Sequence, residues 1–393
     1  MPERNLDFDS IQNRKNTRSL KYDFAVKRGM PEDVLPLWVA DMDFKTSSYI
    51  EDALVERCHE AIFGYSDVQT PYFEIVKGWM QRRHNWTPEE KWLVKTPGVV
   101  CALATAVRAF TEPGDSVIIQ QPVYYPFASV VEDNGRKLAV SNLVQDENGY
   151  YRMDLVDFEK KIVENAVKLF ILCSPHNPIA RVWTEDELKA VGDICRAHGV
   201  IVVSDEIHSD FVFEGEHHVF ASLRKEYEDM CVICTAPSKT FNLASMTLSN
   251  IFIPNRELKH KFVAELYSAG VSELPVFGLI ACETAYTSGE EWYQAMMKYV
   301  KGNIDFVREY VSEKLPGVKM GTHEGTYLVW LDFRSCGMTA EELEDMIVNK
   351  AKLWLDSGTM FGEAGAGFQR INVTCPRSVL KEAMDRLWAA MNA

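Results

Sequence analysis

The chain lacks several features that would assign it at once to a class of protein. None of its 393 residues belongs to an apolar run long enough to cross a bilayer, so we expect no membrane partner. Positively charged residues are fewer than negatively charged ones, and the net charge is -15. This charge opposes binding to nucleic acid. No internal repeat or low-complexity segment is present. What remains, 47% hydrophobic and 25% charged residues, is typical of a globular protein with a sizeable core.

Metal-site and disulfide patterns are also missing. The nine cysteines are an odd number and lie mostly in apolar runs, as buried reduced thiols do. Cys231 and Cys234 form a CxxC pair, but in a strand they would point to opposite faces, and no second pair completes a zinc site. The first nine residues carry both charge signs and no apolar core, unlike a secretory signal. We therefore expect a cytoplasmic protein with no bound metal.

Short β-rich runs alternate with helical patterns from residue 96 onward. The runs are 117–119, 137–140, 169–173, 200–203, 231–234 and 250–253. Helical stretches such as 185–198 and 256–269 separate most of them. This alternation predicts an α/β fold whose mostly parallel sheet is covered by helices on both faces. In such sheets ligands bind at the carboxyl ends of the strands.

The pattern changes after residue 286. A long helical stretch at 291–315 is followed by strands at 327–333 and 369–373, and by helices that begin near Thr339 and Arg377. These elements predict a smaller α+β domain. We expect three parts: an N-terminal arm that joins the small domain (1–48), a large domain (49–286) and a small C-terminal domain (287–393).

Lys239 follows one of the buried runs. It has Pro237 and Ser238 before it and no neighbouring charge. In apolar surroundings the ammonium form loses hydration, so the pKa falls and the neutral amine, which attacks carbonyls, becomes available. The alternative is a loop lysine whose stem packs while its head stays in water.

Two further runs end in polar side chains. Asn177 lies in a Pro-His-Asn-Pro turn after the run 169–173, where its amide offers both a donor and an acceptor. Asp205 follows the run 200–203, and a carboxylate buried there needs a cation or a donor, unless it caps a helix. A metal site is the weaker interpretation, because no cluster of His or Cys accompanies Asp205.

A third feature is the start of a helix after Pro97-Gly98. The apolar positions from Val99 onward follow helical spacing, and the first turn has no acidic side chain. Free backbone N–H groups beside a glycine make a seat for phosphate. The alternative is an ordinary amphipathic helix after a turn.

Asn177, Asp205 and Lys239 thus follow the ends of three predicted strands, in that order along the chain. Pyridoxal 5'-phosphate uses such a set: a lysine for its aldehyde, a carboxylate for its ring nitrogen, a donor for its phenolate oxygen and a phosphate seat. Tyr124, after the first strong strand, can stack on the ring.

Several motifs that occur together make the chain similar to the fold-type I aminotransferase superfamily. They are Thr96-Pro-Gly-Val-Val100, Pro122-Val-Tyr-Tyr-Pro126, Ser174-Pro-His-Asn-Pro178, Ser204-Asp-Glu-Ile-His208 and Ala236-Pro-Ser-Lys-Thr-Phe-Asn242. Further motifs resemble its MalY/PatB/cystalysin-like cystathionine β-lyase branch: Leu37-Trp-Val-Ala-Asp-Met-Asp-Phe44, Gly64-Tyr-Ser66, Trp354-Leu-Asp-Ser-Gly358, Met360-Phe-Gly362 and Gln369-Arg-Ile-Asn-Val-Thr-Cys-Pro-Arg377. The resemblance covers essentially the whole chain and implies a large domain with a seven-stranded type of sheet.

The resemblance also implies residue roles. Lys239 would bond to the cofactor and carry the α-proton. The remaining cofactor contacts would be Asp205 and His208 at the ring nitrogen, Asn177 at the phenolate oxygen, Tyr124 on the ring, and Val99, Val100 and Ser238 at the phosphate. Arg370 would hold the substrate carboxylate, unless it is a surface strand arginine, with Tyr125 and Ala40 also at the substrate. Tyr65 would reach the phosphate of the neighbouring subunit in a homodimer.

The implied reaction is α,β-elimination from L-cystathionine or a related cysteine derivative, giving a thiol, pyruvate and ammonia. Transamination of an L-amino acid is the alternative and uses the same residues. A regulatory protein that uses this fold to bind a partner is the third hypothesis. Two positions depart from the family pattern, since Ala180 and Ser245 stand where glycine is usual. These changes affect the expected substrate and leave the expected cofactor unchanged.

Overall fold

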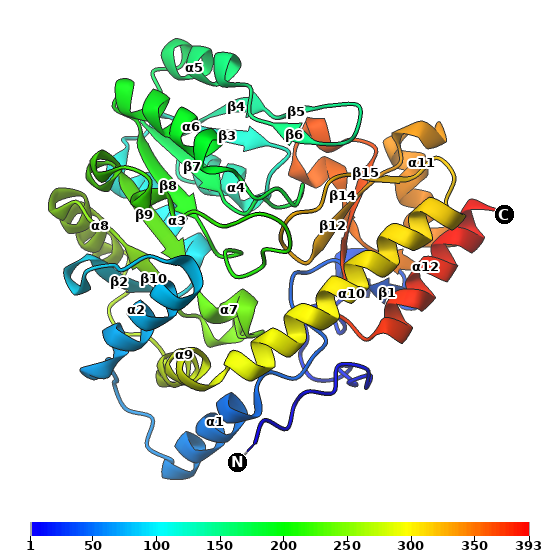
Figure 1. Ribbon diagram of the computed structural model, residues 1–393, viewed down its shortest axis with the longest axis horizontal. Helices are drawn as coiled ribbons and strands as arrows, with labels where there is room; N and C mark the ends of the chain where they lie inside the picture. The colour runs from blue at the N-terminus through cyan, green and yellow to red at the C-terminus, as the bar shows by residue number, and fades with distance from the viewer. Residues whose placement is uncertain (1, 393) are drawn as a thin grey trace.

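The computed structural model describes residues 2–392, so Met1 and Ala393, at the ends of the predicted arm and small domain, lie outside the described part. Helices cover both faces of a central sheet, and a smaller sheet stands beside the long helix α10 (Glu290–Lys314) (Figure 1). This architecture is the α/β fold that the alternating pattern predicts.

The central sheet has seven strands in the order β2-β10-β9-β8-β7-β3-β4. Their bounds are Leu93–Thr96 (β2), Ser249–Phe252 (β10), Cys231–Thr235 (β9), Ile201–Asp205 (β8), Leu169–Cys173 (β7), Ser116–Gln121 (β3) and Lys137–Asn142 (β4). Only β10 runs antiparallel to its neighbours. The middle strands are buried on both faces, which is why they read as continuous apolar runs. Every strand of this central sheet except β2 matches a run predicted from the sequence, so those predictions are confirmed.

Two hydrophobic clusters lie on opposite faces of this sheet. One face packs against α3 (Val99–Phe110), α4 (Pro126–Glu132) and α8 (Arg256–Ser268). The other packs against α2 (Pro71–His84), α5 (Leu155–Glu164), α6 (Glu185–Ala197) and α9 (Val276–Ser288). Cys231 and Cys234 belong to different clusters and both are free thiols, so the predicted opposite orientation is confirmed.

The second sheet is antiparallel, with the order β11-β12-β15-β14. Its strands are Lys319–Met320 (β11), Leu328–Asp332 (β12), Phe368–Asn372 (β15) and Asp356–Ser357 (β14), and α10, α11 (Ala340–Asp345) and α12 (Arg377–Met391) accompany them. Near the N-terminus, β1 (Leu35–Pro36) pairs with β13 (Leu353–Trp354), which precedes β14. The N-terminal segment is therefore bonded to this second part, and α1 (Ser48–Glu60) follows it.

Membrane and metal features were searched within residues 2–392. No helix in that range combines the length and apolar character needed to cross a bilayer. The same range contains no group of three or more His, Cys, Asp or Glu side chains placed to hold a metal ion.

Candidate active site

A cavity of about 160 Å³ lies at the carboxyl ends of the parallel strands, where the sheet topology predicts a ligand site. Nine of the residues expected at the site line it: Ala40, Val99, Val100, Tyr124, Asn177, Asp205, His208, Ser238 and Lys239. They come from six separate segments of the chain. Folding therefore brings together side chains that are up to 199 positions apart, as the bond from Lys239 to Ala40 illustrates.

Lys239 sits in the single turn α7 (Pro237–Thr240), which directly follows β9. Its Nζ donates to the carbonyl oxygen of Ala40 at 2.9 Å. Burial, together with the charge of Arg370, lowers the pKa of Lys239 to about 8, against the opposing charges of Asp41 and Asp205. A substantial fraction of the amine is therefore neutral near pH 8, and the bond of Nζ to the protein does not fit the alternative of a head group left in water.

Asp205 is the last residue of β8 and lies level with Cys173 and Cys234 on the flanking strands. Burial raises the pKa of Asp205 to about 7, against the opposing effects of the Ile207 amide, which donates to it at 3.1 Å, and of Lys239. A cation placed beside this carboxylate would stabilise its ionised form. His208 lies nearby, and burial lowers its pKa well below the usual value, so its ring is neutral.

Arg370 is held from three directions at the second sheet. It donates to Asn177 Oδ1 at 3.0 Å and to the carbonyl oxygen of Trp38 at 2.8 Å, and it forms a buried ion pair with Asp356. Its Nε is buried and has no hydrogen-bond partner among residues 2–392. Because an unpaired buried N–H is costly, this group is suited to receive an oxygen from a ligand. Its burial rules out the alternative of a surface strand arginine.

The first turn of α3 closes another side of the cavity. Gly98, its N-cap, has a φ of 109°, which L side chains rarely adopt, so glycine is required there. The turn contains no acidic side chain, and Val99, Val100 and Ser238 line the same cavity. The amides of a first helical turn have no partner within the helix, so this wall can bind an anion.

The tyrosines differ in position. Tyr124 lines the cavity and is largely buried, and its backbone N–H donates to the Asn177 carbonyl at 3.0 Å. Tyr125 is half-buried, with its ring 5.3 Å from that of Tyr124 and 6.2 Å from that of Phe361. Tyr65 is 97% exposed in the segment between α1 and α2, and it is not part of the cavity. The predicted contact of Tyr65 is with the phosphate of the neighbouring subunit, and it stays a prediction.

The residues present fit pyridoxal 5'-phosphate. A partly neutral buried amine, a desolvated carboxylate, an amide side chain and a helix start without acidic residues surround one cavity. These are the groups that the aldehyde, ring nitrogen, phenolate oxygen and phosphate of the cofactor require. The unpartnered Arg370 Nε adds a place for a substrate carboxylate.

Sequence reasoning missed two contacts. Asp356 pairs with Arg370, whereas in the sequence Asp356 stands out only as part of the motif Trp354-Leu-Asp-Ser-Gly358. The Tyr327 hydroxyl donates to the Ala40 carbonyl at 3.0 Å, beside the bond from Lys239. The first contact depends on the register of β14 against β15, and the second joins segments 287 positions apart, so no local pattern in the sequence signals them.

The two departures from glycine have different consequences. Ala180 has a φ of 58°, so it adopts the left-handed conformation that glycine adopts most easily. Its carbonyl accepts the amides of Glu324 and Gly325 at 2.8 and 2.9 Å, which ties the loop after β7 to the second part of the molecule. Ser245 lies in a 3-10 turn (Ala244–Met246) without a left-handed conformation, so glycine is not needed there.

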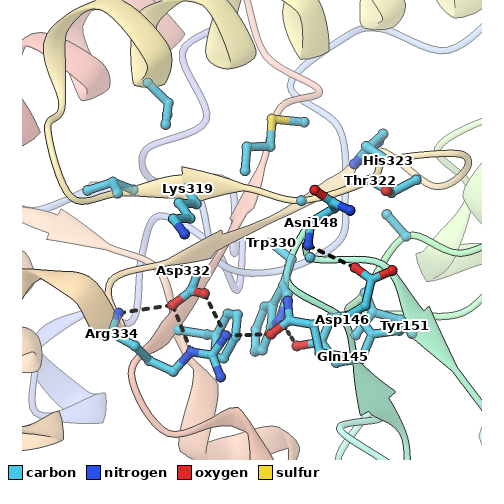
Figure 2. Close-up of a pocket in the computed structure, with 18 of the residues that line it drawn as sticks. Gln145, Asp146, Asn148, Tyr151, Lys319, Thr322, His323, Trp330, Asp332 and Arg334 are labelled. Atoms are coloured by element: carbon cyan, nitrogen blue, oxygen red, sulfur yellow. Dashed lines mark hydrogen bonds and ion pairs between the residues drawn. The ribbon is translucent and has the colours of Figure 1, made fainter.

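A larger cavity, about 670 Å³, lies elsewhere, between the hairpin of β5 (Val144–Gln145) and β6 (Tyr151–Arg152) and the strands β11 and β12 (Figure 2). Arg334 is bonded there to Asp332 at 2.7 Å and to Gln145. None of the predicted site residues lines this cavity. It is a polar seam between the hairpin and the second sheet, and size alone does not identify the reactive site.

Comparison with known proteins agrees with this geometry. Residues 46–387 match the family "Aminotransferase class I and II". The chain is 42% identical over 388 residues to the cystathionine beta-lyase PatB of Bacillus subtilis, covering 98% of this chain and 100% of the relative. It is 31% identical to the protein MalY of Escherichia coli over 99% of both chains.

Solved structures show the same likeness. Cystalysin from Treponema denticola, which contains a pyridoxal 5'-phosphate cofactor, superposes with a TM-score of 0.94 and 38% identity over 98% of each chain. A C–S lyase from Staphylococcus hominis with the same cofactor bound gives a TM-score of 0.91 and 30% identity over 98% of each chain. The similarity extends over both parts of the fold.

Proposed function

Because the chain belongs to the family of class I and II aminotransferases, we propose that it is a carbon–sulfur lyase that uses pyridoxal 5'-phosphate to cleave L-amino acids with sulfur at Cβ. The observation that carries this proposal is the half-buried Lys239, with a pKa of about 8, in one cavity with Asp205 and Asn177. The reaction is α,β-elimination. A thioether of L-cysteine, such as L-cystathionine, takes up one water and gives a thiol, pyruvate and ammonia.

The bound cofactor supplies an aldehyde for the substrate amine and a ring that accepts the electron pair left at the α-carbon. The neutral Nζ of Lys239 would take the α-proton of the bound substrate. The C–S bond then breaks as the electron pair moves to sulfur, and the Lys239 ammonium is a proton source for the departing thiolate. The enamine product takes up water and yields pyruvate and ammonia.

Asp205 would hold the ring nitrogen of the cofactor in its protonated form, because a desolvated carboxylate is stabilised by a cation beside it. His208 lines the same cavity as a neutral ring and would support Asp205 there. The side-chain N–H groups of Asn177 would donate to the phenolate oxygen of the cofactor, since its Oδ1 already accepts from Arg370. This bond couples the orientation of the cofactor to that of the substrate-binding arginine.

The other assigned residues position the reactants. The Val99 and Val100 amides and the Ser238 hydroxyl would hold the phosphate, and Tyr124 would stack on the ring. Arg370 would bind the α-carboxylate of the substrate through Nε. Tyr125 and the carbonyl of Ala40 would also contact the substrate. Arg370 contributes more than charge, because its planar fork fixes the direction of the carboxylate.

A homodimer follows from the same proposal. Tyr65 is 97% exposed, and Val55, Ile62 and Phe63 around it are also exposed apolar side chains. Exposed apolar side chains in this short stretch of chain support a subunit contact. In the dimer Tyr65 reaches the phosphate held by the partner subunit, so each site uses both chains.

We divide the subunit into an arm (1–48), a large domain (49–286) and a small domain (287–393). The pairing of β1 with β13 supports the assignment of the arm to the small domain. All nine cysteines are free, which supports a cytoplasmic location, where thiols stay reduced.

The decisive experiment mixes the holoenzyme with L-cystathionine and no keto acid, and follows pyruvate. Sustained pyruvate formation over many turnovers is expected of a lyase. Product that stops at about one equivalent per site and resumes only when a keto acid is added would identify an aminotransferase and refute the proposed reaction.

A further inference from the structure

A second arginine lies on the Arg370 side of the active site. Arg28 ends a 3-10 turn, Val26–Arg28, in the N-terminal arm, and it is exposed. Its guanidinium lies 5.3 Å from the centre of the Trp38 ring. No carboxylate among residues 2–392 comes within the 4.0 Å of an ion pair with it, so its charge has no partner within the subunit.

Trp38 links this arginine to the substrate site. The backbone carbonyl of Trp38 accepts from Arg370 at 2.8 Å, while its ring carries Arg28. The Trp38 ring also stacks on the ring of Trp354, with 4.4 Å between the ring centroids, and this contact fixes the plane of the Trp38 ring. Trp354 lies two residues before Asp356 in the chain. One buried residue therefore contacts both guanidinium groups, one through its main chain and the other through its side chain.

Tyr125 gives independent support for this placement. It was assigned to the substrate site, and burial raises its pKa, with Asp356 adding to the rise. The charges of Arg370 and Arg28 both oppose the rise in pKa. The Tyr125 hydroxyl therefore lies within electrostatic reach of both arginines, and the wall of the site extends from Arg370 towards Arg28.

We propose that Arg28 binds a carboxylate at the far end of the substrate, so that the enzyme prefers cysteine thioethers whose departing thiol carries a carboxylate. This inference rests on the proposed lyase function. Arg370 takes the α-carboxylate, and Arg28 takes the distal one. An exposed guanidinium on an aromatic face is suited to this, because the ring fixes its plane and leaves its N–H groups free.

The test compares three L-cysteine thioethers of similar length: S-(2-carboxyethyl), S-(2-carbamoylethyl) and S-(2-aminoethyl). Their distal groups are negative, neutral and positive. We expect the wild type to favour the carboxylate over the amide by about fivefold in kcat/KM, mainly through KM, as an exposed ion pair allows. Added salt should reduce this preference, because the contact is exposed.

Substitution of Arg28 should then change the preference without abolishing turnover. Arg28→Gln should remove the advantage of the carboxylate, Arg28→Lys should retain part of it, and Arg28→Glu should favour the aminoethyl compound. The matched control is Lys27→Gln, which removes an exposed charge from the same turn. It should leave the preference unchanged.

Each contrary result has a distinct meaning. An unchanged preference in Arg28→Gln, or an equal loss in Lys27→Gln, refutes the assignment of Arg28 and leaves the lyase function intact. A wild-type enzyme that releases pyruvate from none of the three thioethers and not from L-cystathionine refutes the proposed function and the inference with it.

Discussion

Arg370→Ala should destabilise the fold as well as weaken substrate binding. The guanidinium and its partner Asp356 are 3% and 2% exposed, and Arg370 also donates to Asn177 and Trp38. Truncation leaves the Asp356 carboxylate buried without a cation. Breaking a buried pair in this way costs about 3–5 kcal/mol of the free energy of unfolding.

The loss should depend on pH. Burial raises the pKa of Asp356 and Arg370 opposes the rise, so without Arg370 the pKa rises further. An acid whose pKa is raised by folding holds its proton more tightly in the folded state. The free energy of unfolding therefore falls as pH rises above the pKa of about 3.9 that the aspartate has in the unfolded chain. The slope can reach about 1.4 kcal/mol per pH unit. Arg370→Ala should therefore lie closer to the wild type at pH 5 than at pH 8.

Urea unfolding of the cofactor-free protein, followed by tryptophan fluorescence at both pH values, measures this difference. Arg334→Ala is the matched control, because its ion pair with Asp332 is 52% exposed on the arginine side and should contribute only about 0–1 kcal/mol. The double variant Arg370→Ala/Asp356→Asn should recover much of the loss at pH 8. A double variant as unstable as Arg370→Ala, or a loss independent of pH, would refute the buried-charge explanation.

Three further outcomes are expected. Lys239→Ala should lose both turnover and the visible absorbance of the lysine-bound cofactor; normal activity would exclude its assigned role. Uptake of pyridoxal 5'-phosphate by the cofactor-free protein should accelerate with pH around a midpoint near 8, because the pKa of Lys239 is about 8 and the neutral amine attacks; a rate independent of pH between 7 and 9 would contradict this. Mixing the poorly active Tyr65→Ala with the inactive Lys239→Ala should restore roughly a quarter of wild-type activity, because half of the dimers then contain one intact site; no recovery would argue against a shared site.

Most of the architecture could be predicted because its signals are local. Buried strands such as 169–173 read as apolar β-rich runs, and helices such as 256–268 read by their spacing. The strand β2 was missed, because Leu93–Thr96 includes Lys95 and is half-buried in alternation. Its place at the sheet edge is determined by pairing with β10, a contact about 150 positions away that no window of sequence contains.

By itself, the sequence determined which residue types the site would contain and at which strand ends they would lie. Asn177, Asp205 and Lys239 follow apolar runs whose ends meet at one edge of a parallel sheet, so their proximity follows from chain order. Only the tertiary structure decided the contacts of Arg370 with Asp356, and of Trp38 with Arg28. The bond from Arg370 to the Trp38 carbonyl joins the second sheet to the arm, and the charges of Arg370 and Asp356 are desolvated only because these segments exclude water together.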